Sequence, residues 1–168
     1  MIVLGIDSAS CSGWALLDGC RPIKYGTINA REPARIDTLA ALVNSIGRPD
    51  LVAIEDSYLG ENVNTVKVLS RIQGRFEQAF ATRGIPTELV MADVWQKALL
   101  TGLITGKSKS AERKRAAAIW VKATYGLVVS EDIADAIGIG TFVARRELFA
   151  GKVRASSGAL PRSEIVTR

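Results

Sequence analysis

Short apolar runs separated by polar turns divide the start of the chain into strands. The runs IVLGID (2–7), GWALLD (13–18) and IKYGTI (23–28) each have the length of a strand. The Asp18-Gly19 step between the second and third runs is a turn signal. We therefore predict three antiparallel strands, of which residues 2–7 are central.

Longer segments carry apolar residues three to four positions apart, which predicts helices. These segments are residues 32–46, 62–83, 92–100, 110–124 and 131–149. Two further apolar runs, DLVAIE (50–55) and PTELVM (86–91), have the length of buried strands. The resulting order, β-β-β-α-β-α-β-α-α-α, predicts an α/β fold with a mixed five-stranded sheet and helices on its faces. Ligands of such sheets tend to bind at the carboxyl ends of the strands.

The length of 168 residues favours one domain, which we expect over residues 1–150. The segment 151–168 contains Ser, Gly, Pro and scattered charge, and we predict a flexible basic tail there. No apolar run approaches the roughly 18 residues of a membrane span, and the N-terminus has no signal-peptide pattern. We expect a cytoplasmic protein.

The residue composition excludes several kinds of catalysis. The chain has no histidine, which removes Ser-His-Asp and Cys-His mechanisms and the commonest zinc ligand. Cys11 and Cys20 have no second pair at metal-binding spacing, so we expect reduced thiols. A net charge of +5 suits a polyanionic partner but is not specific to one. Hydrolysis by this chain would therefore depend on carboxylates, lysines or a hard metal ion.

Two acids stand at the ends of apolar strands. Asp7 closes the run 2–7, and Glu55 closes the run 50–55. Strand alternation places Asp7 on the face of Val3 and Gly5, and Glu55 on the face of Leu51 and Ala53. Taken alone, each acid is explained equally well as a residue that has just left the core and caps a turn.

Two more acids lie in DIADAIGIGTFVA, a segment that is apolar almost all round and so predicts a buried helix. Asp135 has no Lys or Arg three or four residues away, so it needs a distant cation, and a bound metal is the simpler one. Asp132 lies one turn earlier on the same face. An acid in a first helical turn, with Ser130 as N-cap, also has a purely structural explanation.

Four carboxylates at one edge of a sheet would repel one another unless a cation lay among them. Ligands that are all oxygen select magnesium or manganese over zinc. Two such ions about 4 Å apart can clamp a phosphodiester and activate water. This chemistry requires no histidine.

A basic segment, GKSKSAERKR (106–115), contains five cations and one acid. Most such runs are solvated helix faces. This run, however, begins a predicted helix, where the helix dipole disfavours cations and a phosphate backbone would offset that cost. Tyr58 follows Glu55 in a polar stretch, where its ring either packs on a helix or stacks on a base.

These motifs together resemble the RuvC family of Holliday-junction resolvases, within the RNase H-like superfamily. The resemblance runs from Met1 to about Ala150. GID (5–7), AIEDSY (53–58) and DIADA (132–136) are similar to the family's acidic motifs, and WQKALLTG with GKSKS is similar to its basic segment. Ser8-Ala9 stands where the family commonly has Pro-Gly, and the loop between Gly102 and Lys109 also differs, which suggests an atypical or phage-type member.

The resemblance implies a role for each matching residue. Metal ligands and catalytic residues would be Asp7, Glu55, Asp132 and Asp135, holding two Mg²⁺ or Mn²⁺ ions per active site, with Lys109 as a further catalytic residue. DNA contacts would be made by Tyr58, Lys97, Lys107 and Lys109. The basic run at 106–115 itself adds Arg113 and Lys114 as predicted DNA contacts.

The implied activity is that of a crossover junction endodeoxyribonuclease. It would resolve four-way branched DNA by paired symmetric nicks that leave 5′-phosphates. It would act as a homodimer through the helix at 62–83, whose apolar positions an ordinary core would explain equally well. Two alternatives stay open, a YqgF-like RNA-processing nuclease and a catalytically silent module that binds branched DNA. A sugar-kinase-like phosphotransferase would need two such domains, and the chain is too short for them.

Overall fold

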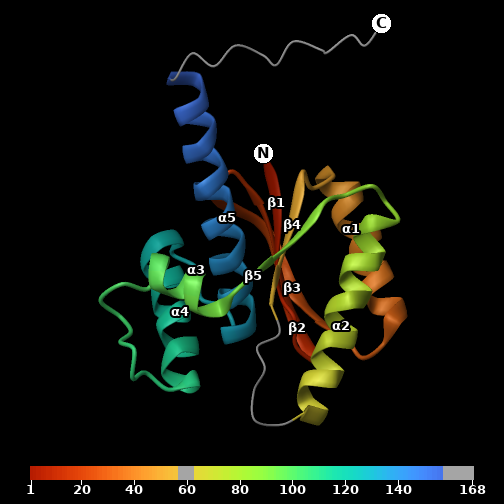
Figure 1. Ribbon diagram of the computed structural model, residues 1–168, viewed down its shortest axis with the longest axis horizontal. Helices are drawn as coiled ribbons and strands as arrows, with labels where there is room; N and C mark the ends of the chain where they lie inside the picture. The colour runs from red at the N-terminus through yellow and green to blue at the C-terminus, as the bar shows by residue number, and fades with distance from the viewer. Residues whose placement is uncertain (57–62, 157–168) are drawn as a thin grey trace, which may run out of the picture.

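The computed structural model describes residues 1–56 and 63–156. Five strands form one mixed sheet at its centre (Figure 1). The strands are β1 (Ile2–Asp7), β2 (Cys11–Asp18), β3 (Arg21–Asn29), β4 (Leu51–Glu55) and β5 (Thr87–Val90). Their order is β3-β2-β1-β4-β5, with β1–β2 and β2–β3 antiparallel and β1–β4 and β4–β5 parallel. The predicted sheet, its central strand and its antiparallel start are confirmed.

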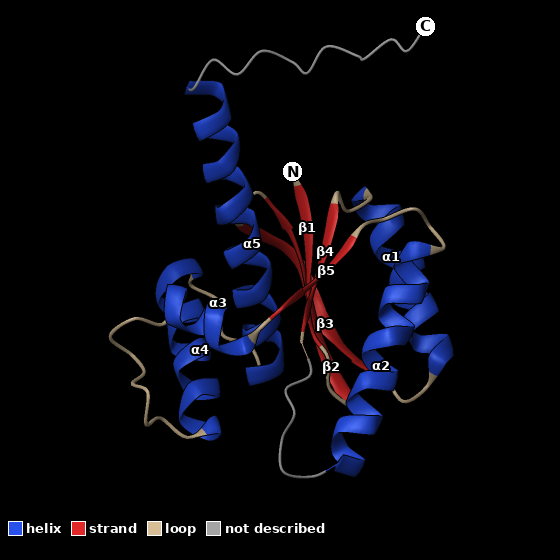
Figure 2. Cartoon of the chain, viewed as in Figure 1, coloured by secondary structure: helices blue, strands red, loops and turns tan. Residues whose placement is uncertain are grey.

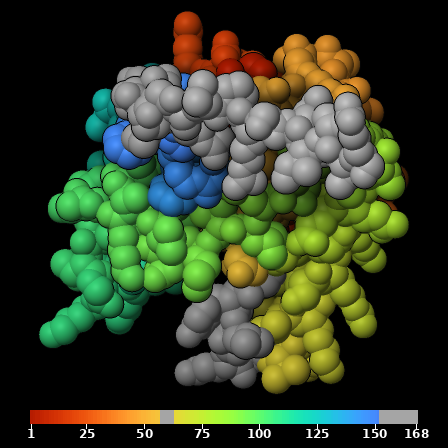
Figure 3. Space-filling model, turned by 45° about the horizontal axis from the view of Figure 1, so that its top comes forward, coloured from red at the N-terminus to blue at the C-terminus, as the bar shows by residue number. Residues whose placement is uncertain are grey.

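Five helices cover the two faces of the sheet (Figure 2). They are α1 (Pro33–Gly47), α2 (Val63–Ala81), α3 (Ala92–Leu99), α4 (Ser110–Tyr125) and α5 (Glu131–Ser156). α1 and α2 lie on one face, and α3, α4 and α5 lie on the other. The same division appears in the space-filling view, where α2 (yellow) and the α3–α4 segment (green to teal) form opposite sides (Figure 3).

The predicted helices are confirmed, but α5 ends at Ser156 rather than at residue 149. Gly151 lies inside this helix and does not end it, because one glycine in a helix interior costs only about 1 kcal/mol. The rest of the predicted tail, residues 157–168, lies outside the described residues. Within the described ranges, no helix has both the length and the apolar character that a membrane crossing requires. Cys11 and Cys20 are free thiols.

Strand alternation separates the side chains into two cores. Leu4 and Ile6 of β1 point toward α1 and α2, where large side chains such as Phe76 and Phe80 are fully buried. Val3 of β1 points the other way, into a core formed by α3, α4 and α5. Gly5 and Asp7 follow Val3 on that face, as the alternation predicts.

Glycines bring α5 unusually close to β1 and β2. A Cβ atom on Gly13 would lie 1.9 Å from the carbonyl oxygen of Asp132, and one on Gly5 would lie 2.2 Å from that of Ala136. On the helix side, a Cβ on Gly140 would lie 2.4 Å from the side chain of Leu17. At Gly5 and Gly13 the atoms met are helix backbone, so no larger side chain fits there and the backbone of α5 packs directly on the two strands.

Candidate active site

The first two acids lie on neighbouring strands. β1 and β4 run parallel, with Gly5 opposite Ala53 and Ile6 opposite Ile54. The next position on each strand is its last residue, Asp7 on β1 and Glu55 on β4. Both carboxylates therefore emerge at the same edge of the sheet and on the face that α5 covers. The side chain of Asp7 is almost fully buried, with 5% of the residue exposed.

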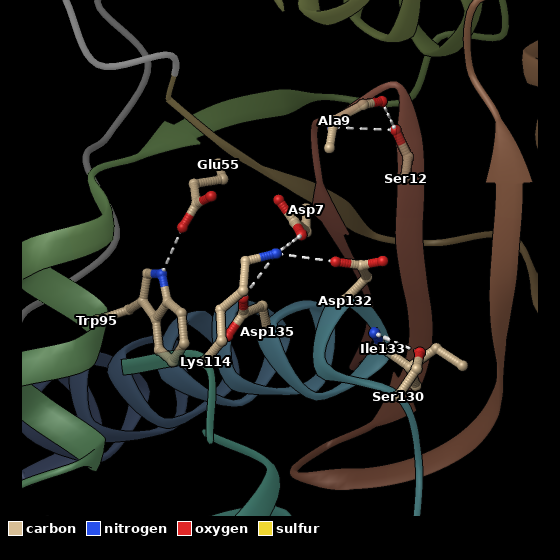
Figure 4. Close-up of polar contacts among 10 residues, drawn as sticks. All are labelled: Asp7, Ala9, Ser12, Glu55, Trp95, Lys114, Ser130, Asp132, Ile133 and Asp135. Carbon is tan, nitrogen blue, oxygen red and sulfur yellow. Dashed lines mark hydrogen bonds and ion pairs between the residues drawn. The ribbon is translucent and has the colours of Figure 1, made fainter. Parts of the chain in front are cut away.

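The other two acids come from the first turns of α5. Ser130 precedes this helix and its Oγ accepts a hydrogen bond from the backbone N–H of Ile133 at 3.4 Å, so the predicted N-cap is confirmed. The contact at Gly13 seats the first turn of α5 against β2, which directs Asp132 and Asp135 toward the end of β1 (Figure 4). The predicted convergence of four acids is thus observed in the fold.

Lys114 of α4 places its ammonium group among these carboxylates (Figure 4). Its Nζ donates a hydrogen bond to Oδ1 of Asp132 at 2.8 Å and lies 3.9 Å from both Asp7 Oδ2 and Asp135 Oδ2. Lys114 is therefore the distant cation that Asp135 requires. Among the described residues it is the only cation in an ion pair with these acids, so one positive charge faces four carboxylates.

Burial and mutual repulsion disfavour the charged forms of the deepest acids. Burial and the nearby Glu55 raise the pKa of Asp7 to about 8, against the partial compensation of Lys114. Burial and the charges of Asp7 and Glu55 raise the pKa of Asp135 to about 8 as well. Burial lowers the pKa of Lys114, but the hydrogen bond to Asp132 and the surrounding carboxylates outweigh it and raise that pKa above its usual range. In the absence of a further cation, Asp7 and Asp135 are therefore mostly protonated at neutral pH.

Glu55 is oriented by a neighbour that the sequence reasoning did not identify. Trp95 of α3 donates a hydrogen bond from its indole Nε1 to Glu55 Oε1 at 3.0 Å. Ser8 donates a hydrogen bond from Oγ to the backbone carbonyl of Glu55 at 2.9 Å, which ties the β1–β2 loop to the end of β4. Burial is the main cause of the raised pKa of Glu55, and the hydrogen bond from Trp95 acts in the opposite direction.

Two buried oxygens of the cluster lack hydrogen-bond partners. They are Asp7 Oδ2 and Asp135 Oδ1, and among the described residues they are the only buried side-chain polar atoms of this kind. A buried acceptor without a partner costs about 1–3 kcal/mol, so these oxygens fit a ligand that accepts electron pairs. In this arrangement, within the described part of the chain, no three acidic or cysteine side chains are grouped tightly enough to hold an ion. An all-oxygen donor set of this kind suits Mg²⁺ or Mn²⁺.

The other predicted DNA contacts lie around this cluster rather than in it. Lys107 and Lys109 are exposed, and Lys109 immediately precedes α4, where its backbone N–H donates to the Glu112 carboxylate. Lys97 is exposed and pairs with Asp93 at 2.8 Å. Tyr58 lies outside the described residues.

Arg113 has internal partners. Its Nε donates to the carbonyl oxygen of Ser108, and its NH1 donates to Oε1 of Gln96 at 2.9 Å. It therefore fastens the loop before α4 to α3.

The position of Lys114 was the main feature that the sequence reasoning missed, since it was grouped with the DNA contacts. A signal for it was present. Ala117 and Val121, three and seven residues further along α4, are fully buried, so Lys114 shares the inward face of that helix. Trp95 carried no comparable signal, because an indole on an apolar helix face is usually core.

Comparisons with known proteins give structural relatives and no sequence relatives. No protein-family model matches the chain, and no curated protein matches it. Thermus thermophilus RuvC in complex with a Holliday junction superposes with a TM-score of 0.69 at 19% identity, over 88% of this chain and 96% of that one. The Thermus thermophilus RuvC structure without a named ligand gives a TM-score of 0.66 at 23% identity, over 88% and 97% of the two chains.

Resolvases from other sources are also similar. Fowlpox virus resolvase with Holliday junction DNA gives a TM-score of 0.57 at 14% identity, over 88% of this chain and 99% of that one. The yeast mitochondrial Holliday junction resolvase Ydc2 gives 0.56 at 13% identity, over 92% and 82%. The chain therefore has the RNase H-like fold of RuvC, and the predicted fold class is confirmed.

Proposed function

We propose that this protein is a divalent-metal-dependent endonuclease that resolves four-way DNA junctions by paired nicks leaving 5′-phosphates. The observation that carries the proposal is the convergence of four carboxylates at one edge of the sheet, with two buried oxygens that have no hydrogen-bond partner. The fold supports the choice of substrate, because structures with a TM-score of 0.56 or more to this chain include three resolvases of different origin.

Asp7, Glu55, Asp132 and Asp135 would hold two Mg²⁺ or Mn²⁺ ions, which supply an activated water and stabilise the leaving 3′-oxygen. The residues of this chain do the positioning. Trp95 keeps one oxygen of Glu55 in a hydrogen bond and so sets the direction of the other. The glycine contacts between α5 and β2 fix how close the start of α5 lies to the sheet, and so fix the positions of Asp132 and Asp135 relative to Asp7.

Lys114 has a second role when the acids hold ions. Its side chain is 35% exposed, so the ammonium group has access to solvent as well as to the carboxylates. A scissile phosphate brought to the cluster would offer it a new partner, and an ammonium at that place stabilises the charge that develops on the phosphoryl oxygens. Lys107 and Lys109 would contact the DNA backbone nearby.

Lys109 keeps its proposed part in the reaction. We expect Lys109→Ala to reduce the cleavage rate more than junction affinity, measured by single-turnover kinetics and by titration with chelator present. An equal loss in both would reduce Lys109 to a phosphate contact.

A homodimer would present two such sites to opposite strands of the junction. Of the five apolar positions predicted along α2, Ile72 and Phe76 are core residues of the chain itself. Val63, Val66 and Leu69 remain at least partly exposed, with Val63 64% exposed, and the first half of α2 is the surface that we propose for the dimer. Val63→Asp should give a monomer of unchanged stability by sedimentation, since an acid suits a helix start.

The direct test is cleavage of labelled four-way junction, fork, plain duplex and precursor RNA with Mg²⁺, Mn²⁺ or chelator. We expect paired metal-dependent nicks in the junction only, and their loss in Asp7→Asn with junction binding retained. Asp18→Asn, the same change at an exposed turn at the other end of β1 and β2, is the control and should cut normally.

The other outcomes have distinct meanings. Cutting of precursor RNA and not of junctions would favour the RNA-processing alternative. Tight junction binding without cleavage under either metal would favour the silent binding module. Full activity of Asp7→Asn would exclude Asp7 as a metal ligand.

A further inference from the structure

A cavity of about 600 Å³ opens beside the carboxylate cluster. Glu55, Lys114 and Asp135 form the wall that it shares with the cluster. The remaining walls come from the residue after β4 and from the first turns of α3 and α4. Whatever binds at the acids therefore has a neighbouring space of the size of a small ligand, continuous with the reaction site.

One side of this cavity is apolar and adaptable. Met91, directly before α3, lines it and is 53% exposed, and Ala92 lies beside it. A thioether side chain packs favourably against flat aromatic faces because it is polarisable and flexible. A flat apolar surface that entered the cavity would cover the exposed side of Met91.

Another side offers a hydrogen-bond donor of fixed direction. Gln96 lines the cavity and is only 7% exposed. Its Oε1 accepts a hydrogen bond from Arg113, and because a guanidinium can only donate, the oxygen must be the atom that faces Arg113. The Nε2 amino group is the part of Gln96 left to bind a ligand, since it makes no hydrogen bond to the described residues. The site thus presents an N–H donor.

The charges of the cavity select against an anionic occupant. Asp56 and Asp93 line it in addition to Glu55 and Asp135, while its two cations already have partners, Arg113 in Gln96 and Ser108 and Lys114 in Asp132. A phosphate inside would face four acidic side chains and no cation without a partner. A neutral group with apolar faces and hydrogen-bonding edges fits instead.

We propose that the cavity receives one nucleobase of the strand being cut, next to the scissile phosphate, and that Gln96 selects a base with a carbonyl acceptor. This inference rests on the proposed function. Taking a base out of its stack is unfavourable, less so at an already distorted junction, and contact with Met91 offsets part of that cost. Gln96 then becomes a residue that determines sequence preference, separate from the acids that perform the cleavage.

The test uses junctions that differ only at the nucleotides flanking the cut. Thymine, with two carbonyl groups, is compared with adenine, which has none, at each flanking position in single-turnover reactions. At one position we expect wild-type protein to cut the thymine junction about 10-fold faster, the discrimination typical of one good base contact. In Gln96→Leu that ratio should fall to within about 2-fold.

Gln96→Glu is the sharper variant. It keeps an acceptor for Arg113, which preserves the local fold, but replaces the donor by a second acceptor. The preference should reverse in favour of adenine, whose amino group donates. Gln78→Leu, the same change as Gln96→Leu at an exposed position on α2, should keep the wild-type ratio and is the matched control. Equal rates for thymine and adenine in wild-type protein would overturn the proposal.

A binding measurement separates this inference from the nuclease itself. The fluorescent base 2-aminopurine, placed at the flanking position, should brighten severalfold when wild-type protein with chelator removes it from its stack. Met91→Ala and Gln96→Leu should both reduce that increase. An increase in fluorescence without cleavage would support base binding in the cavity and contradict the nuclease proposal. Cleavage without a fluorescence increase or a base preference would support the nuclease proposal and refute base binding in the cavity.

Discussion

The two faces of the sheet are packed by opposite means. On the side of α1 and α2, large side chains fill the space between helices and strands, and Phe76 and Phe80 are fully buried there. On the other side, larger side chains such as Trp95 fill the space under α3 and α4, but where α5 crosses β1 and β2 glycines let helix backbone meet strand backbone. The first face carries none of the four acids. The second carries all four, and they lie next to the tight crossing of α5 over β1 and β2.

This difference shows how the fold positions the carboxylates. A layer of long side chains can shift by rotamer changes, whereas two backbones in contact have one separation. The backbone carbonyl of Asp132 approaches β2 closely because Gly13 has no side chain. This contact fixes the position of Asp132 relative to Asp7. We therefore expect the α1–α2 face to be sensitive to lost volume, and the α5 face to be sensitive to added volume.

The largest expected effect is a loss of stability on the α1–α2 face. Phe76→Ala removes a fully buried ring and should lower the free energy of unfolding by about 3–5 kcal/mol. Urea unfolding measures this change. Junction cleavage at low temperature, per folded molecule, should stay near the wild-type rate, because Phe76 lies in the core on the face of the sheet opposite α5 and the acids. A large loss of cleavage in the folded variant would contradict the separation of the two faces.

Adding one carbon atom on the α5 face should have the reverse consequence. Gly13→Ala places a methyl group against Asp132 and must displace α5, costing about 1–3 kcal/mol of stability. Cleavage should fall about 100-fold, since small displacements of catalytic groups cost that much. Gly47→Ala, at a site with nothing within 4 Å, is the control and should leave cleavage unchanged. Normal cleavage by Gly13→Ala would show that the acids tolerate movement of α5.

Removing the central cation tests the electrostatics of the α5 face. Lys114→Met preserves the length of the side chain but leaves Asp132 without its ion pair, so the chelator-treated protein should lose about 1 kcal/mol of stability. Mg²⁺ should then raise the melting temperature more in this variant than in wild-type protein, since no ammonium competes for the carboxylates. Lys109→Met should change neither quantity. A smaller Mg²⁺ effect in Lys114→Met would mean that the lysine assists ion binding.

The last comparison concerns the pH dependence of the metal-free protein. Asp7 and Asp135 have folded-state pKa values raised to about 8 from 3.8, so the folded state binds more protons than the unfolded state between these values. Their contribution to stability is therefore full below pH 3.8 and is lost as pH rises through 8. Melting temperatures in chelator should fall less steeply with pH in Asp135→Asn. Saturating Mg²⁺ should remove most of the difference, and parallel curves in chelator would contradict the raised pKa values.

Much of the fold was readable from local patterns. The strand over residues 2–7 and the helix starting at residue 131 are where the pattern predicted, because alternation and helical periodicity reflect which face is buried. The shared face of Asp7 and Glu55 followed from the same rule. The end of α5 was predicted too early, since the Ser, Gly, Pro and charge content of residues 151–168 indicated a tail, whereas the helix continues to Ser156.

The sequence by itself determined which residue types are available for chemistry and where along each element they occur. Without histidine, and with acids at the ends of two strands and at the start of a helix, oxygen-ligand metal chemistry was the consistent interpretation. Only the tertiary structure decided that Lys114, rather than Lys109, lies among the acids, that Trp95 orients Glu55, and that a cavity adjoins the cluster. These features join residues from separate helices and strands. Their distances depend on how closely α3, α4 and α5 pack against the sheet, which periodicity along one segment does not encode.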